Sequence, residues 1–171
     1  MKLILIVISL VLFLACTETV EVEKPEKWTK DDSINLGKSL AFEQEMEIKL
    51  FLKLRPEWEI VETGSGLKYW IYEKSEDTLK PIPGNTVDVS FEVRLLNDSL
   101  CYQTDPNELS SFLVDKSHVE SGVQEGVKYL SKGDKAKFII PSHIGHGLVG
   151  DLEKIPPLQV LIVDIELIDI R

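Results

Sequence analysis

Apolar and polar residues alternate along residues 87–94, where Val87, Val89, Phe91 and Val93 are separated by charged or hydroxyl side chains. Successive side chains of a strand point to opposite faces, so this pattern predicts a half-buried antiparallel strand. Alternation or enrichment in aromatic and branched residues predicts further strands within residues 64–73, 136–140 and 161–167, with short strand candidates at residues 100–103 and 112–114. Apolar residues at 119, 123, 127 and 130 predict one amphipathic helix. The expected architecture is α+β, with four or five antiparallel strands around one central helix.

A second helix is predicted before this fold, between Thr29 and Arg55. Thr29 and Asp32 have the spacing of a capping box, and a proline directly after Arg55 ends the helix. Its apolar residues form one stripe that includes Gln44, and a second apolar set broadens that face. Two interpretations stay open: the helix docks on the domain that follows, or residues 31–55 pair two copies of the chain into a homodimer.

The first residues have the pattern of a secretion signal. The apolar run over residues 3–15 has 13 residues, fewer than the roughly 20 that cross a bilayer as a helix. It closes on Leu-Ala-Cys at Cys16, which resembles the lipobox of bacterial lipoproteins, although Phe13 stands where Leu is usual. We therefore expect residues 1–15 to be a lipoprotein signal peptide and Cys16 to be the lipid attachment site.

Residues 16–30 mix Thr, Glu and Lys without an apolar period, which predicts a solvated tether that begins at the acylated Cys16. The protein is thereby expected in the bacterial cell envelope, held on a membrane by acyl chains. An Asp directly after the cysteine would resemble an inner-membrane retention signal, but this chain has a different residue there. The outer membrane is therefore favoured.

Charge narrows the function further. The 171 residues carry 19 Lys and Arg against 29 Asp and Glu, a net charge of −10, which argues against nucleic acid as a partner. His118, His143 and His146 lack Cys, Asp or Glu at supporting spacings, so neither a metal nor another cofactor is expected. Cys101 lies in a predicted strand and is expected to be a core thiol.

Several short motifs follow one another in the C-terminal two thirds of the chain. They are Gly122 and Glu125-Gly126 in the predicted helix, Gly133, Ile140-Pro141, and Ile155-Pro156-Pro157 before the last strand. Together with the order of elements over residues 63–170, they resemble the FKBP-type peptidyl-prolyl cis-trans isomerases. The resemblance implies an FKBP-like domain at residues 63–171, after a helical segment at residues 31–62. With the lipobox and tether, the layout is similar to FKBP-type lipoproteins of Bacteroidetes, which include one associated with gliding motility.

The resemblance also implies a pocket that binds proline-containing polypeptides. The residues that it carries over are Phe91, Tyr102, Gln103, Val119, Glu120, Val123, His146, Ile155 and Val163, with Phe112 or Ser110 as a further candidate. Val123 replaces a Trp, Val163 a Phe, and His146 a hydrogen-bonding Tyr, which predicts a wider pocket. Losing roughly 100 Å² of ligand contact at about 25 cal/mol per Å² weakens binding by ~2.5 kcal/mol.

Isomerisation of an X-Pro bond needs no pair of catalytic acid and base, because the obstacle is amide resonance, which opposes rotation by roughly 20 kcal/mol. An apolar pocket that favours the twisted amide, with a few hydrogen-bond donors, lowers that barrier. The expected function is a peptidyl-prolyl cis-trans isomerase that assists the folding of exported envelope proteins. The pocket substitutions leave an alternative open, a non-catalytic binding module of an envelope or motility complex.

Overall fold

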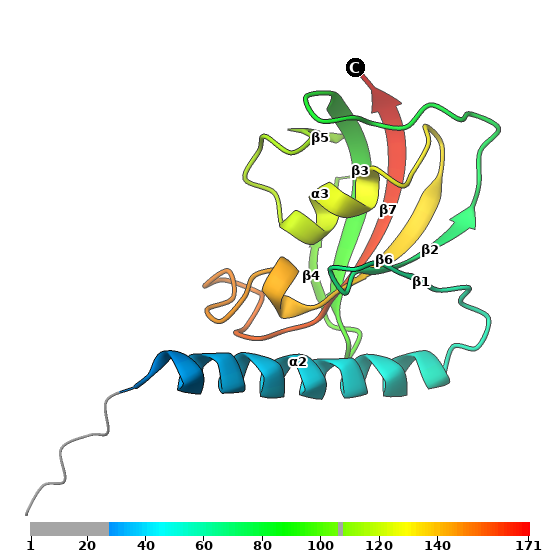
Figure 1. Cartoon of the computed structure of the whole chain (residues 1–171). Coiled ribbons are helices and arrows are strands. Elements are labelled where there is room, and N and C mark those ends of the chain that lie inside the picture. Colours follow the sequence, from blue (N-terminus) through cyan, green and yellow to red (C-terminus); the bar gives the residue numbers. More distant parts are fainter. Residues whose placement is uncertain (1–27, 106–107) are drawn as a thin grey trace, which may run out of the picture. The chain divides into compact units, whose positions relative to one another are not determined.

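The computed structural model describes residues 28–105 and 108–171 (Figure 1). The chain divides into two units, residues 1–34 and residues 35–171. The elements of the described residues are α2 (Lys30–Lys53), β1 (Val61–Glu62), β2 (Lys68–Glu73), β3 (Thr86–Leu95), β4 (Leu100–Gln103), β5 (Ser110–Leu113), α3 (Ser121–Val127), β6 (Lys135–Ile140), the 3-10 helix η1 (Ser142–Ile144) and β7 (Leu161–Ile170). The predicted signal peptide, Cys16 and the tether as far as residue 27 lie outside the described residues.

α2 begins directly after Thr29, the first residue of the predicted capping box. The backbone N–H of Thr29 donates to Asp32 Oδ2 at 2.8 Å, and the N–H of Asp32 donates to Thr29 Oγ1 at 3.2 Å. These bonds satisfy donors that have no partner within the first turn of a helix. Hydrogen bonds from the hydroxyl and N–H of Thr29 also lower the pKa of the Asp32 carboxyl.

The strands of the described residues form one antiparallel sheet in the order β1-β2-β6-β7-β3-β4. The outer edge of β3 is shared, because β5 pairs with residues 86–89 and β4 with residues 92–94. The α+β class is confirmed, although the sheet has seven strands where the sequence predicted four or five. β1 has two residues, which is too short for an alternating pattern to be visible.

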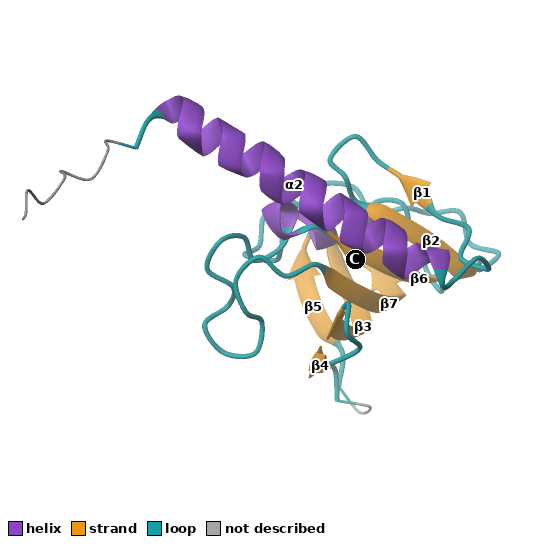
Figure 2. Cartoon of the chain, turned by 90° about the horizontal axis from the view of Figure 1, so that it is seen from below, coloured by secondary structure: helices purple, strands orange, loops and turns teal. Residues whose placement is uncertain are grey.

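Where β6 ends and β7 begins, the side chains are buried on both faces of the sheet. Phe138 of β6 and Val163 of β7 face the main core beneath α3, whereas Ile139 and Ile162 face a second core with Ile48 of α2. Seen from below, the part of α2 within residues 35–171 lies across these strands (Figure 2). The interpretation that the helix docks on the following domain is therefore confirmed for its part within residues 35–171.

α3 is shorter than the sequence predicted, because it ends at Val127 and Val119 precedes it. Leu130 follows the helix and is fully buried. The apolar spacing therefore identified residues that lie in the core, including one outside the helix. Gly126 lets α3 approach the sheet: a Cβ there would lie 2.4 Å from a ring carbon of Phe138. Glu120, the residue before α3, lines a cavity at the N-terminal end of the helix.

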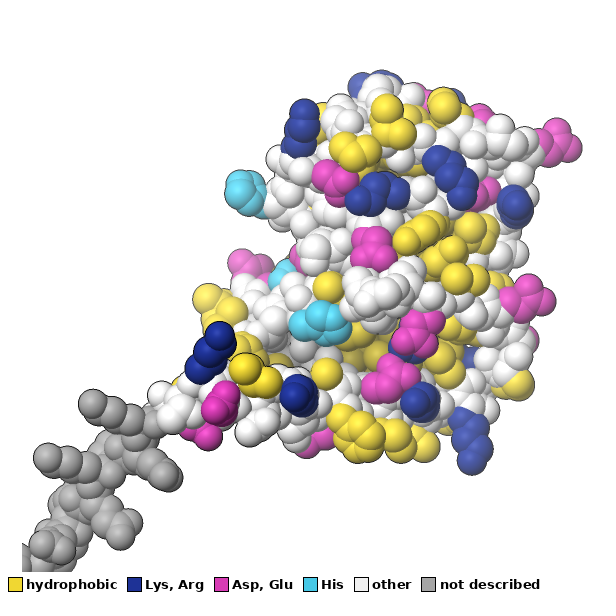
Figure 3. Space-filling view, in the orientation of Figure 1, with side chains coloured by type: hydrophobic (Ala, Val, Ile, Leu, Met, Phe, Trp, Pro, Cys, Tyr) yellow, Lys and Arg dark blue, Asp and Glu magenta, His cyan; other side chains and the backbone are white. Residues whose placement is uncertain are grey.

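α2 also presents apolar side chains to solvent. Figure 3 shows hydrophobic side chains gathered along the lower edge of the molecule, over α2. Phe42, Met46, Leu50 and Leu54 follow one another at intervals of four residues and are 43% to 79% exposed. Within the described residues, no helix is long and apolar enough to cross a bilayer.

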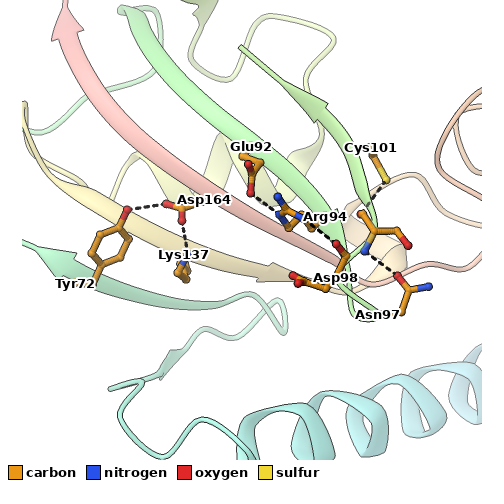
Figure 4. Close-up of polar contacts among 9 residues, drawn as sticks. Tyr72, Glu92, Arg94, Asn97, Asp98, Cys101, Lys137 and Asp164 are labelled. Atoms are coloured by element: carbon orange, nitrogen blue, oxygen red, sulfur yellow. Dashed lines mark hydrogen bonds and ion pairs between the residues drawn. The ribbon is translucent and has the colours of Figure 1, made fainter. Parts of the chain in front are cut away.

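Polar contacts lie on strands β2, β6 and β7 and at the β3–β4 turn (Figure 4). The hydroxyl of Tyr72 donates to Asp164 at 2.7 Å, and Lys137 pairs with the other oxygen of the same carboxylate. Partial burial and this carboxylate raise the pKa of the Tyr72 hydroxyl. At the β3–β4 turn, Arg94 donates to the carbonyl oxygen of Asp98 at 2.8 Å, and nearby Cys101 is 4% exposed, as expected of a core thiol.

Candidate active site

Two adjoining cavities open between α3, the sheet and the loop over residues 141–160. Their volumes are about 170 Å³ and 470 Å³, within reach of the size of small-ligand sites. They share the lining residues Phe91, Val93, Glu120, Val123 and Val163. The shared wall is apolar except for the Glu120 side chain, and we treat the two cavities as one pocket.

All of the site residues predicted from the resemblance line this pocket. Val119 and Phe112 line the smaller cavity, where Ser110 also lies, so the structure places both alternatives at the pocket. The larger cavity is lined by Tyr102, Gln103, His146 and Ile155, and the remaining predicted residues lie in the shared wall. Segments from residue 91 to residue 163 thus converge on one site.

The inward-facing residues of β3 lie in two environments along the strand. Val87 and Val89 are at most 1% exposed in the core, whereas Phe91 and Val93 are half-buried. Val89 lines only the smaller cavity, whereas Phe91 and Val93 lie in the wall that both cavities share. Alternation identified the inward face of the strand, but it did not distinguish a core position from a cavity wall.

Glu120 and His146 meet at the pocket. Glu120 is the N-cap residue of α3, and its carboxylate oxygen Oε1 lies 2.8 Å from His146 Nε2. Both side chains are about one quarter exposed, so neither is buried as an uncompensated charge. The contact fixes the imidazole ring of His146 at the edge of the larger cavity.

Asp151 connects the wall of the pocket to β4. Its Oδ1 accepts the N–H groups of Glu153, Lys154 and Ile155 at 2.8 Å to 3.0 Å, and its Oδ2 accepts the hydroxyl of Tyr102 at 2.5 Å. Partial burial acts to raise the pKa of Asp151, but these hydrogen bonds outweigh it and hold the pKa well below its usual range. The hydrogen bond to Asp151 raises the pKa of Tyr102 to about 12. Tyr102 therefore stays protonated and donates to the loop.

Sequence reasoning missed part of the lining. Val93, Leu161 and Ile165 could have been found, because they share the alternating face of Phe91 or Val163. Asp151 and Glu153 lie in an irregular loop that has no period. Their place at the pocket follows from the loop's hydrogen bonds, which no sequence pattern reports.

The histidines do not gather. His143 Nε2 contacts the carbonyl oxygen of Ser65 at 2.8 Å, whereas His146 contacts Glu120. Among residues 28–105 and 108–171, no three His, Cys, Asp or Glu side chains are grouped as metal ligands.

The fold and the pocket define an FKBP-like domain, and comparisons with known proteins agree. A family model described as FKBP-type peptidyl-prolyl cis-trans isomerase matches residues 78–168. The FKBP-type peptidyl-prolyl cis-trans isomerase FkpA of Buchnera aphidicola subsp. Schizaphis graminum is 35% identical over 72% of this chain and 48% of its own length. FK506-binding protein 2 of Dictyostelium discoideum is 34% identical over 58% of this chain and 76% of its own length. The crystal structure of FkpA from Escherichia coli matches with a TM-score of 0.63 and 27% identity, over 82% of this chain and 64% of that chain.

The chain belongs to the FKBP-type peptidyl-prolyl cis-trans isomerase family. The matched residues include every predicted pocket residue, whereas α2 precedes them. The chain spans about half of the length of the FkpA relatives from Buchnera and Neisseria meningitidis.

Proposed function

We propose that the chain catalyses cis/trans isomerisation of X-Pro bonds in the pocket between α3 and β3. The observation that carries this proposal is the convergence of the predicted site residues on one largely apolar cavity. Such a cavity removes water from the bound amide, and the twisted amide, which is less polar than the planar one, loses less by leaving water. A rate increase of 10⁴ requires about 5.5 kcal/mol of preferential binding to the twisted form.

The named residues have distinct parts in this proposal. Phe91, Val123 and Val163 form the apolar wall that receives the proline ring. His146, held by Glu120, is the polar group at the cavity edge that meets the client's backbone. The reaction forms and breaks no covalent bond, so the chain needs no nucleophile.

The test is exchange NMR of a proline peptide with the full-length chain in detergent micelles. Phe91→Ala removes a wall of the pocket, and we expect exchange catalysis to fall at least tenfold. Phe42→Ala is the matched control, since it makes the same change at a side chain that is 68% exposed on α2. Absence of catalysis by the folded wild-type chain would falsify the proposal.

The alternative, a non-catalytic binding module, rests on the small side chains of Val123 and Val163, which leave the pocket wide. The same NMR samples distinguish the two functions. Peptide shifts on titration without exchange catalysis would favour the binding module, and catalysis would exclude it.

We also propose that the protein acts on exported envelope proteins as a lipoprotein of the outer membrane, with a link to gliding motility. The apolar run that ends at Cys16 and the resemblance to FKBP-type lipoproteins support this proposal. Metabolic labelling with an alkyne fatty acid tests the anchor. We expect label on the wild-type chain and none on Cys16→Ser, whereas equal labelling of both would contradict it.

The exposed stripe of Phe42, Met46, Leu50 and Leu54 supports pairing of two copies through residues 31–55. Sedimentation velocity of the full-length chain in detergent should show a dimer, and Leu50→Lys should shift it to monomer. A wild-type chain that stays monomeric at all concentrations would exclude this interface.

A further inference from the structure

The loop that forms one wall of the pocket is fastened at its base to α2. The side chain of Gln44 is 6% exposed and lies among apolar residues of the helix. Its Nε2 donates to Ser142 Oγ at 2.7 Å and to the carbonyl oxygen of Leu158 at 2.9 Å. Its Oε1 accepts the N–H of Ser142 at 3.0 Å. One buried amide therefore holds both ends of the loop that carries His146, and its donors and acceptor are all engaged.

The two ends of the loop are in turn connected to the residue beside His146. The N–H of Gly147 donates to the carbonyl oxygen of Ser142 at 2.8 Å, and the carbonyl oxygen of Gly147 accepts the N–H of Leu158 at 2.9 Å. Gln44 is thus connected to the backbone of Gly147 through one residue at each end of the loop, Ser142 at one end and Leu158 at the other. A shift of either end of the loop moves the position from which the His146 ring extends toward the cavity.

Leu158 needs such support because of its backbone conformation. Its φ is +59°, in the left-handed region that residues with bulky side chains rarely adopt. Hydrogen bonds hold the residue from both sides, through its N–H to Gly147 and through its carbonyl oxygen to Gln44. Without the Gln44 amide, the bond that fixes the carbonyl side of this strained residue is lost.

We infer that Gln44 is a positioning residue for the pocket, through which the docking of α2 sets the geometry of the loop that carries His146 and Ile155. The inference rests on the proposed isomerase function. It also extends the site beyond residues 78–168, since α2 lies outside the part of the chain that the family model matches. A bound partner that displaces α2 would act on the pocket through this amide.

The variant that tests this role is Gln44→Met in the full-length chain. Met has a similar length and helix propensity, but it can neither donate to Leu158 nor accept from Ser142. Ile48→Ala is the control, because Ile48 is fully buried one turn further along α2 and packs in the second core, which meets the loop only at its last residue, Val160. Phe51→Leu is a milder control at the same core, should Ile48→Ala fail to fold.

The probe is a blocked Ala-Leu-Pro-Phe peptide, measured by exchange NMR at 10 °C after circular dichroism has shown each variant to be folded. We expect Gln44→Met to lower kcat about tenfold and to leave KM within about twofold, because the apolar wall that binds proline is not touched. The control should leave both constants within about twofold of wild type. Unchanged kcat in Gln44→Met, or an equal loss in the control, would overturn the inference.

Amide hydrogen exchange by mass spectrometry gives a second reading that does not depend on catalysis. Exchange over residues 145–151 should accelerate about tenfold in Gln44→Met and stay at the wild-type rate in the control. If the wild-type chain shows no catalysis, the proposed function fails, and this exchange experiment alone decides the role of Gln44. Equal exchange in wild type and Gln44→Met would then overturn it.

Discussion

The same substitution at two helical glycines should have opposite effects on stability. At Gly126 of α3, an added Cβ would lie 2.4 Å, 2.7 Å and 2.8 Å from three ring carbons of Phe138. At Gly37 of α2, an added Cβ would meet nothing within 4 Å. Replacing Gly by Ala in a helix interior contributes up to about 1 kcal/mol in both cases, so the sign depends on the space available.

The expected magnitude at Gly126 follows from the depth of the overlap. Carbon atoms make favourable contact at roughly 3.5 Å, so the ring of Phe138 or the helix must retreat by about 1 Å. Phe138 is fully buried in the central strand β6 and has no free volume to move into. Overpacking of this kind costs about 1–3 kcal/mol, and the steep overlap places Gly126→Ala at the upper end. After the gain in helix propensity, we expect a net loss of about 2 kcal/mol.

Urea unfolding of the full-length chain, followed by tryptophan fluorescence, measures both variants. Gly126→Ala should lower the midpoint, and Gly37→Ala should leave it unchanged or raise it. Since α3 carries Glu120 and Val123 to the pocket, Gly126→Ala should also reduce isomerase activity in the folded protein. A Gly126→Ala protein as stable as wild type would refute the argument that Gly126 is needed for close packing of α3.

Three further predictions concern the pocket. The pKa of Asp151 lies below its unfolded value near 3.9. Its contribution to stability is therefore present above that pH and is lost as the pH falls through the folded pKa. In urea titrations at several pH values, Asp151→Asn should be less stable than wild type at pH 7, and its stability should depend less on acid. Tyr102→Phe keeps the aromatic ring but removes the bond to Asp151, and we expect faster amide exchange over residues 151–155 with little change in the rest of the sheet. Val163→Phe adds about 40 Å² of apolar contact to the pocket, worth about 1 kcal/mol, so NMR titration should show about fivefold tighter binding of a proline peptide. An unchanged affinity in a folded Val163→Phe protein would contradict the assignment of that wall.

Much of the fold could be read from periodicity and end signals. The capping box at Thr29 and Asp32 located the start of α2, and alternation located β3 and β7. These signals are local, since they depend on side-chain direction and on backbone donors within one turn of helix. α3 was predicted too long because residues before and after it share the core, and burial alone does not show where the helical hydrogen bonds stop.

The site was predicted from a different kind of information. No period or spacing connects Phe91, Tyr102, Glu120 and His146, and the ordered motifs of the family resemblance brought them together. The structure adds what that resemblance did not contain, namely the bond between His146 and Glu120 and the attachment of Tyr102 to Asp151. Both bonds use residues that depart from the family pattern or lie in an irregular loop.

The sequence by itself determined the order and type of the elements other than the short β1 and η1, the inward faces of the strands and the presence of a polar Gln44 within an apolar stripe. Only the tertiary structure decided what that glutamine does, because its partners Ser142 and Leu158 lie 98 and 114 residues away along the chain. Local patterns report which side chains must leave water, since burial follows the period of a helix or strand. They do not report which distant polar groups meet, because a hydrogen bond requires two backbones to be placed within about 3 Å by the packing of the whole domain.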